Sequence, residues 1–258
     1  MTAVLTNSGQ LATRRVRAFL RQPWFIAVTL VQPMIWLLLF GQLFKGITTM
    51  PGFPDVTYIA FLTPGVVVMT AMFSNGWSGM SVITDLDRGV MDRFLVTPVR
   101  RGSLIAGDLA YQGLTTVLQT IIVLAIGWIA GARFPGGPAS LLALTVAVVL
   151  LGTAFAALSN AIALTVRQEE SVIGVNQFMV LPLAFLSSTL LPLSLAPAWI
   201  QHIARWNPVN WAVEVGRQSI VASPDWSGIG LRLLGLAAVA LLTAWWSTRA
   251  FRSYQRSV

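Results

Sequence analysis

The sequence predicts an all-α polytopic membrane protein with six transmembrane helices. Of the 258 residues, 55% are hydrophobic and only 10% are charged, whereas a soluble domain carries roughly 25% charged residues. Apolar runs of the length that crosses about 30 Å of hydrocarbon recur along the chain, separated by short clusters of charge. Residues 1–258 are therefore expected to form a single transmembrane domain.

An N-terminal amphipathic interface helix is expected at residues 8–22. Val16 and Phe19 fall on one helical face, while Arg14, Arg17 and Arg21 fall on the opposite one. Such a helix lies at the level of the lipid headgroups. A basic tail without fixed structure fits the same residues.

The six spans follow from the apolar runs. They are expected at residues 24–44, 58–83, 104–130, 141–166, 171–195 and 229–248. Pro182 and Pro192 should kink or end the fifth span, because proline removes a backbone donor from a helix.

A re-entrant helical hairpin is expected at residues 196–228, between the fifth and sixth spans. This stretch is too apolar for a solvated loop, and its tryptophans favour the membrane interface. Asn207 suits the N-cap and Pro208 the first turn of a helix too short to cross the membrane. Glu214 and Arg217 are three residues apart on that helix and could pair.

The basic residues predict the orientation. With the N-terminus inside, twelve of the seventeen Arg and Lys residues lie in inner segments and five in outer ones. Both termini are therefore expected to be cytoplasmic. The same distribution explains the net charge of +8 as membrane topology, so no nucleic-acid partner is expected.

Composition excludes several kinds of chemistry. The chain has no cysteine and one histidine, which excludes thiolate catalysis and predicts no metal site. A P-loop needs a lysine after a glycine-rich turn, and the sole lysine, Lys45, stands at the outer end of the first span. Any ATP-driven work would need a separate subunit.

The polar residues deep in the spans are uncharged, which disfavours proton or sodium coupling. Uncharged polar groups more often join helices, but with nearby aromatics they could also line a path for a hydrophobic or amphipathic substrate. The residues considered for this path are Phe73, Trp77, Gln112, Gln119, Phe155, Asn160, Asn176 and Phe178.

Residues 76–79, Gly-Trp-Ser-Gly, match the pattern of intramembrane serine proteases. Ser78 as a nucleophile would need a histidine base within hydrogen-bond reach. The only candidate, His202, lies in the outer hairpin, most of a membrane away. Close helix packing at these small residues is the favoured interpretation, and an intramembrane serine hydrolase the alternative.

The inner loop at residues 84–102 contains apolar residues at helical spacing among charged ones, and Pro98 ends the pattern. A short amphipathic helix under the membrane suits docking into a groove of another protein. A plain surface helix fits equally well.

This loop resembles the corresponding segment of type-2 ABC exporter permeases, in which an acidic residue precedes a helix that ends in Pro-x-Arg, here Pro98-Val99-Arg100. The Asn207-Pro208 element followed by Glu214 resembles the hairpin of the same family. The likeness covers nearly the whole chain and is strongest to daunorubicin-resistance-type permeases of actinobacteria. The loop departs from the family pattern at Thr84-Asp85, where Glu followed by Gly-Thr is frequent.

The resemblance implies the permease subunit of an exporter in the bacterial plasma membrane. Two copies of a cytoplasmic ATPase would hold ATP and Mg, a second permease chain would complete the complex, and this chain would need no cofactor. The docking residues implied are Asp85, Asp87, Arg88, Met91, Asp92, Arg93, Phe94, Leu95, Pro98, Arg100, Arg101, Glu169 and Glu170. The outer gate implied comprises Asn207, Pro208, Glu214 and Arg217.

Overall fold

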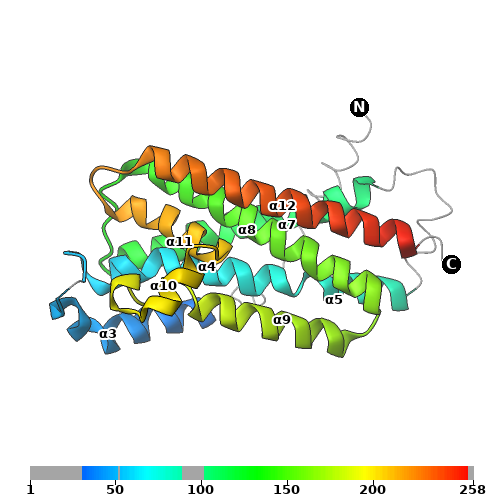
Figure 1. The fold of residues 1–258 in the computed structure, drawn as a ribbon, viewed down its shortest axis with the longest axis horizontal. Helices are drawn as coiled ribbons and strands as arrows, with labels where there is room; N and C mark the ends of the chain where they lie inside the picture. Colours follow the sequence, from blue (N-terminus) through cyan, green and yellow to red (C-terminus); the bar gives the residue numbers. More distant parts are fainter. Residues whose placement is uncertain (1–30, 52, 89–101, 255–258) are drawn as a thin grey trace.

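The computed structural model describes residues 31–51, 53–88 and 102–254, and every regular element within these ranges is helical. The long helices run roughly parallel to the longest axis of the molecule (Figure 1). Four of them are long and apolar enough to cross a membrane. The prediction of an all-helical, multi-pass membrane protein is confirmed at this level. The predicted interface helix at residues 8–22 and residues 89–101 of the predicted inner loop lie outside the described residues.

The first long span, Tyr58–Asp87, consists of two helices, α4 (Tyr58–Gly76) and α5 (Ser78–Asp87). Thr57 caps α4, because its hydroxyl accepts a hydrogen bond from the Ala60 amide at 3.3 Å. Most side chains of α4 are buried, including Phe61, Leu62 and Met72. The span therefore lies inside the bundle rather than at its lipid-facing surface.

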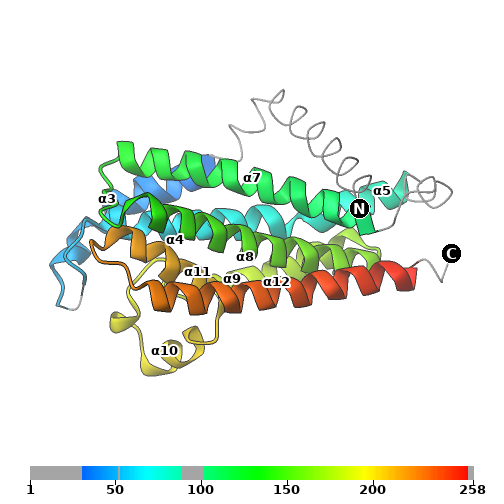
Figure 2. The same cartoon turned by 90° about the horizontal axis from the view of Figure 1, so that it is seen from above.

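Three further long helices complete the bundle. They are α7 (Gly102–Ile129), α8 (Gly137–Val166) and α12 (Trp226–Tyr254). Helices α7 and α8 pack against α4, whereas α12 packs against α8 and the predicted hairpin. Helix α8 packs against α4, α5, α7 and α12, and its buried residues Leu144, Val148 and Leu151 belong to the main core. Helix α12 lies alongside α8 in both views (Figures 1 and 2). Large apolar side chains on its other face, among them Leu231 and Leu241, are exposed and available to lipid.

The described part of the predicted first span is the shorter apolar helix Val31–Leu43, which includes the π-helical turn η1 (Trp36–Phe40) and α3 (Gly41–Leu43). Trp36, Phe40 and Phe44 stack along it, with ring centroids 4.5 and 5.5 Å apart. Phe44 continues the stack to Tyr58 of α4 at 5.9 Å. These contacts hold the first helix against the start of α4, and the 3₁₀ turn η2 (Lys45–Thr49) follows.

The predicted fifth span is shorter than expected. Helix α9 (Glu169–Phe185) contains Pro182 and ends three residues after it, not at Leu195. The chain then turns through residues 186–192 and a 3₁₀ turn, η3 (Leu193–Leu195). The physical reason is that Asn207, far along the chain, satisfies the carbonyl groups that the end of α9 leaves free, as described below.

The predicted hairpin contains two short helices, α10 (Ala198–Ala204) and α11 (Pro208–Arg217), followed by the 3₁₀ turn η4 (Gln218–Ile220). Asn207 is the N-cap of α11 and Pro208 occupies its first turn, as predicted. The buried face of α11, which includes Ala212, Val213 and Val215, packs against α8, α12 and α4.

Candidate functional site

Asn207 joins the end of α9 to the start of α11. Its side-chain oxygen accepts a hydrogen bond from the Val209 amide at 2.9 Å. Its side-chain NH₂ group donates to the carbonyl oxygens of Leu183 at 2.7 Å and Leu186 at 2.9 Å. One buried amide thus satisfies groups that two helix ends leave without intrahelical partners. This fixes the hairpin to the point where α9 stops.

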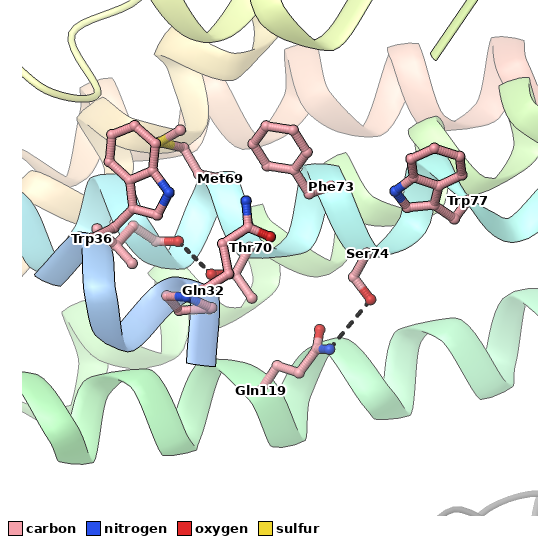
Figure 3. A pocket seen from close by; sticks show the side chains of 10 residues that line it. Gln32, Trp36, Met69, Thr70, Phe73, Ser74, Trp77 and Gln119 are labelled. Atoms are coloured by element: carbon pink, nitrogen blue, oxygen red, sulfur yellow. Dashed lines mark hydrogen bonds between the residues drawn. The ribbon is translucent and has the colours of Figure 1, made fainter. Parts of the chain in front are cut away.

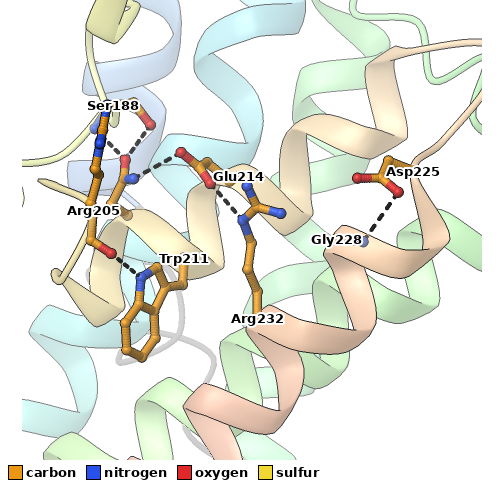
Figure 4. Close-up of polar contacts among 8 residues, drawn as sticks. Ser188, Arg205, Trp211, Glu214, Asp225, Gly228 and Arg232 are labelled. Carbon is orange, nitrogen blue, oxygen red and sulfur yellow. Dashed lines mark hydrogen bonds and ion pairs between the residues drawn. The ribbon is translucent and has the colours of Figure 1, made fainter. Parts of the chain in front are cut away.

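A chain of polar contacts then crosses the hairpin to α12 (Figure 4). The amide and hydroxyl of Ser188 both donate to the side-chain oxygen of Asn210, at 2.9 and 2.7 Å. The side-chain NH₂ group of Asn210 donates to Glu214 at 2.9 Å. Glu214 then forms an ion pair with Arg232 of α12, with Nε and Oε2 2.5 Å apart. The expected pairing of Glu214 with Arg217 is wrong, because Arg232 takes that carboxylate from another helix.

Arg217, three residues after Glu214 on α11, contacts α4 rather than α12. Its guanidinium carbon is 3.9 Å from the centre of the Phe61 ring, a cation–π contact with α4. It also donates a hydrogen bond to the Ser188 carbonyl oxygen. The residue predicted for the outer gate therefore ties α11 to α4 and to the segment after α9.

Gly65 of α4 lets this segment approach closely. A Cβ atom at Gly65 would meet the Thr189 carbonyl oxygen, a backbone atom that cannot turn away. Tyr58, seven residues before Gly65 and on the same face of α4, donates its hydroxyl to the Leu190 carbonyl oxygen at 3.1 Å. The segment after α9 is thus held by α4 on one side and by α11 on the other.

The start of α12 is capped in the loop that precedes it. The Asp225 carboxylate accepts hydrogen bonds from the Ser227 hydroxyl at 2.7 Å and the Gly228 amide at 3.1 Å (Figure 4). These bonds, the Ser227 hydroxyl first, lower the pKa of the Asp225 carboxyl below its ordinary value. In the same hairpin the Trp211 indole donates to the Arg205 carbonyl oxygen at 2.7 Å. These contacts lie within the predicted hairpin and the loop that leads to α12.

Three residues predicted for the substrate path meet at one cavity (Figure 3). Phe73 of α4, Trp77 between α4 and α5, and Gln119 of α7 line it, together with Gln32 and Trp36 of the first described helix. Its volume is about 170 Å³. The side-chain NH₂ group of Gln119 donates to the Ser74 hydroxyl at 3.2 Å. The cavity therefore lies between three helices, with aromatic walls and a glutamine amide at its edge.

The other predicted path residues lie elsewhere. Phe155 and Asn176 line a much narrower pocket between α8 and α9. Gln112 donates to the Ser78 hydroxyl at 3.1 Å, Asn160 is buried, and Phe178 is 81% exposed on α9. The structure therefore does not bring the eight residues together in one site.

Between α4 and α5 the helical hydrogen bonding is interrupted at Trp77. Ser159 of α8 inserts its hydroxyl there, donating to the Gly76 carbonyl oxygen at 2.6 Å and accepting from the Gly79 amide at 2.9 Å. A side chain inserted into the backbone ladder is a known cause of helix kinks. The favoured interpretation of Gly76, Ser78 and Gly79 as a close-packing motif is confirmed, since Asn176 of α9 lies against Gly76 and Ser159 of α8 lies against Gly79.

The structure does not place Ser78 near His202, as an intramembrane serine hydrolase would require. Ser78 is buried at the start of α5 and accepts the hydrogen bond from Gln112. His202 is exposed in α10, which lies toward the opposite end of the molecule from α5 in both views (Figures 1 and 2). Among the described residues, His, Asp and Glu nowhere gather in a group of three that could hold a metal ion.

The described docking candidates lie at one end of the bundle. Asp87 and Arg88 are exposed at the end of α5, and Glu169 and Glu170 are exposed in the first turn of α9. The end of α5 and the turn between α8 and α9 lie at the same end in both views (Figures 1 and 2). Asp85 is partly buried one turn earlier. The remaining candidates, Met91, Asp92, Arg93, Phe94, Leu95, Pro98, Arg100 and Arg101, lie outside the described residues.

Sequence reasoning missed three residues that the structure makes prominent: Arg232, Ser159 and Trp36. Arg232 is the one charge in an otherwise apolar run of the last span, which is a signal for a charged partner at the same depth. Ser159 gave no such signal, because a single serine in a membrane helix usually bonds its own backbone. Trp36 was one of many aromatic residues in apolar runs.

Comparison with known proteins identifies the family. The ABC-2 type transporter family matches residues 7–221. The chain is 27% identical to the daunorubicin resistance ABC transporter permease protein DrrB1 of Streptomyces coeruleorubidus, over 93% of this chain and 84% of the relative. It is 28% identical to nodulation protein J of Rhizobium meliloti (strain 1021), over 86% of this chain and 84% of the relative. It is 24% identical to the probable doxorubicin resistance ABC transporter permease protein DrrC of Mycobacterium tuberculosis (strain ATCC 25618 / H37Rv), over 93% and 84%. The chain therefore belongs to the ABC-2 type transporter family and is a membrane permease, a non-catalytic subunit.

Proposed function

We propose that this chain is the membrane subunit of an exporter that moves a hydrophobic or amphipathic substrate out across the bacterial plasma membrane. The energy comes from ATP and Mg bound to a separate ATPase. The complex contains two copies of that ATPase and two permease chains, alike or different. Relatives named for daunorubicin and doxorubicin resistance support a drug-like substrate.

The observation that carries this proposal is the outer hairpin and its polar contacts. The pair Glu214–Arg232 and the amides of Asn207 and Asn210 connect α9, α11 and α12 at one end of the bundle. A connection of this kind can exist in a closed and an open arrangement, which is what a gate requires. Asn207, Pro208, Glu214 and Arg217 thus form the outer gate.

Six spans are part of the proposal. The helix Val31–Leu43 is the described end of the first span, and α9 is the fifth. With six spans, both termini lie on the same side of the membrane, and the distribution of basic residues makes that side the cytoplasmic one. The exposed end of α5 and the end of α12 lie at the same end of the bundle, which supports this arrangement (Figure 1).

The inner end is the ATPase-docking surface, built from residues 85–101 and from Glu169 and Glu170. Exposed charges of both signs at Asp87, Arg88, Glu169 and Glu170 support it, because charge complementarity orients a partner on its surface. ATP-dependent closure of the two ATPases would favour one arrangement of the spans over the other.

The uncharged middle of the spans supports an apolar substrate. The charged side chains described in the four long spans lie toward their ends, at Asp85, Asp87, Arg232 and Arg249. The cavity beside Phe73 and Trp77 and the narrower pocket beside Phe155 and Asn176 flank the same span, α4–α5. Substrate passes along this span and the interface between permease chains.

The first test is purification from the native membrane in mild detergent, followed by mass spectrometry of the proteins that co-purify. A soluble subunit with a P-loop, in an amount equal to that of the permease chains, is the expected result. Recovery of the folded chain without such a subunit would remove the energy source and overturn the proposal.

The docking surface is tested by charge reversal. The double change Arg88→Glu and Arg93→Glu should weaken ATPase association while leaving membrane insertion intact, because both arginines belong to the predicted inner loop. Arg133→Glu is the matched control, since Arg133 is exposed at the outer end, in the loop before α8. An unchanged complex after the double change would contradict the docking assignment.

The gate is tested with Glu214→Gln. Glutamine keeps an oxygen for Asn210 but leaves the Arg232 guanidinium without its counter-charge, so export should fall more than assembly does. The double variant Glu214→Gln and Arg232→Gln removes both charges and should recover part of the export. Normal export by Glu214→Gln would remove the gate role of that carboxylate.

A further inference from the structure

The cavity between the first described helix, α4 and α7 has the size of one ring rather than of a whole drug molecule. Its volume is about 170 Å³, and an apolar cavity of about 150 Å³ in a protein interior takes up benzene. The rings of Trp36, Phe73 and Trp77 supply flat apolar walls (Figure 3). Gln32 and Trp77 are themselves exposed, so the cavity reaches the surface of this chain.

Gln119 gives the cavity one specific polar group. Its side chain is 6% exposed, and its NH₂ group is taken up by the Ser74 hydroxyl at 3.2 Å. Its Oε1 atom is buried and has no hydrogen-bond partner among the residues that the structure describes. A buried carbonyl oxygen without a partner is unfavourable, so a ligand that brings a hydrogen-bond donor gains affinity at this point.

The lining also excludes charge. Its ten side chains are aromatic, aliphatic, amide, hydroxyl or thioether groups, with no carboxylate or basic group among them. Transfer of a charged group into such surroundings is costly without a counter-charge. The chemistry available is therefore stacking or edge contact with a ring and hydrogen bonds to uncharged groups, among which Gln119 Oε1 is the buried acceptor whose partner is missing among the described residues.

We propose that this cavity is a subsite for a neutral ring that carries a hydroxyl or N–H donor, with the donor hydrogen directed at Gln119 Oε1 and the ring between Trp36, Phe73 and Trp77. The assignment rests on the proposed export function and sharpens its substrate class. Molecules with a phenol-like group bind here, and equally apolar molecules without a donor bind less tightly.

The test uses the purified permease in lipid nanodiscs and three fluorine-labelled probes followed by ¹⁹F NMR. 4-Fluorophenol has a donor, 4-fluoroanisole only an acceptor, and fluorobenzene neither. Empty nanodiscs measure partition into lipid, which is subtracted. The expected order is tightest binding for 4-fluorophenol, by about fivefold over the other two, the factor that corresponds to one ordinary hydrogen bond.

Gln119→Leu should remove this preference and leave fluorobenzene binding unchanged, because leucine keeps the volume and loses the acceptor. Gln177→Leu is the matched control, since Gln177 is exposed on α9 and outside the cavity. Phe73→Ala should weaken all three probes together by removing one wall of the cavity.

Equal binding of the three probes, tighter binding of 4-fluoroanisole, or a phenol preference that survives Gln119→Leu would each overturn the assignment. The three-probe comparison needs no variant, so it decides even if Gln119→Leu does not fold. The measurement contains no ATPase. A negative result in the binding measurement therefore does not affect the purification test of the export function. A negative purification test likewise does not affect the binding result.

Discussion

The spans Tyr58–Asp87 and Gly137–Val166 are equally long, 30 residues each, yet one is interrupted and the other is not. Helix α8 runs without a break from Gly137 to Val166. The span Tyr58–Asp87, in contrast, is interrupted at Trp77 and continues as α5. The break lies where Ser159 of the uninterrupted helix bonds the Gly76 carbonyl and the Gly79 amide. A helix in the interior can thus be divided by its neighbour.

Proline does not cause this break. Pro64 lies inside α4, thirteen residues before Trp77, and the helix continues past it to Gly76. Helix α9, by contrast, ends three residues after Pro182. There the Asn207 side chain donates hydrogen bonds to the carbonyl oxygens of Leu183 and Leu186. The difference teaches that an inserted or capping side chain from elsewhere, more than the proline itself, decides where a helix of this protein stops.

The largest effect is expected for Gly79→Val. A Cβ atom at Gly79 would lie 2.5 Å from the Ser159 carbonyl oxygen, a backbone atom that can move only if α8 moves. We expect destabilisation of about 3 kcal/mol or failure to fold, from overpacking between two central helices. Thermal unfolding in detergent measures it. Gly174→Val on the exposed side of α9, where nothing lies within 4 Å, should melt like the unmodified chain.

The next effect is expected for Ser159→Ala. The change leaves the Gly76 carbonyl and the Gly79 amide without the hydroxyl that now bonds both. Loss of about 1–3 kcal/mol in the free energy of unfolding follows, because buried backbone groups become unpaired. Hydrogen exchange at residues 76–80 should rise as well. The control Thr165→Ala removes a hydroxyl of the same helix that bonds its own backbone, at Ala161. Equal melting of both variants would contradict the bridging role.

A smaller effect is expected for Thr116→Val. The Thr116 hydroxyl accepts from the Asn75 side chain at 2.9 Å just before the break, and Asn75 keeps its second bond, to the Ala71 carbonyl at 2.8 Å. A loss of about 1 kcal/mol is expected for one hydrogen bond between buried side chains. Thr115→Val is the matched control, because its hydroxyl donates only within α7. The free energy of unfolding, measured by denaturation of both variants under the same conditions, should be lower for Thr116→Val than for Thr115→Val.

The smallest effect is expected at the start of α12, which is capped in the loop before the helix rather than inside the bundle. The Asp225 carboxyl has a pKa below its ordinary value of 3.8, so the folded state favours the carboxylate. Its contribution is present above that ordinary value and is lost as the pH falls through the lowered pKa. The first turn of α12 should therefore lose hydrogen-exchange protection below about pH 3.8, after correction for intrinsic exchange rates. In Asp225→Asn this turn should show no such pH dependence.

The sequence predicted features that depend on neighbouring residues. Apolar length located the spans that became α7, α8 and α12, and the Asn207-Pro208 pair correctly placed the start of α11. Phe73 and Trp77, four residues apart, were predicted for one path and do share a cavity.

Features that depend on contacts between residues far apart in the sequence were not predicted. The spacing suggested that Glu214 could pair with Arg217, three residues away, whereas its ion-pair partner Arg232 is eighteen residues away on another helix. The break at Trp77 depends on Ser159, eighty residues beyond Gly79, and no local residue indicates it. The cavity needs Gln119 of α7 beside α4, and only helix packing brings the two together.

The shortness of α9 has a consequence for synthesis of the chain. Its 17 residues rise about 25 Å, less than the roughly 30 Å of hydrocarbon that an independent span must cross. Only Arg167 and Gln168 separate it from α8, and Arg167 takes the left-handed conformation that reverses the chain. If α9 is the fifth span, we therefore expect α8 and α9 to enter the bilayer as one helical pair, in which the longer and more apolar α8 compensates for the short reach of α9.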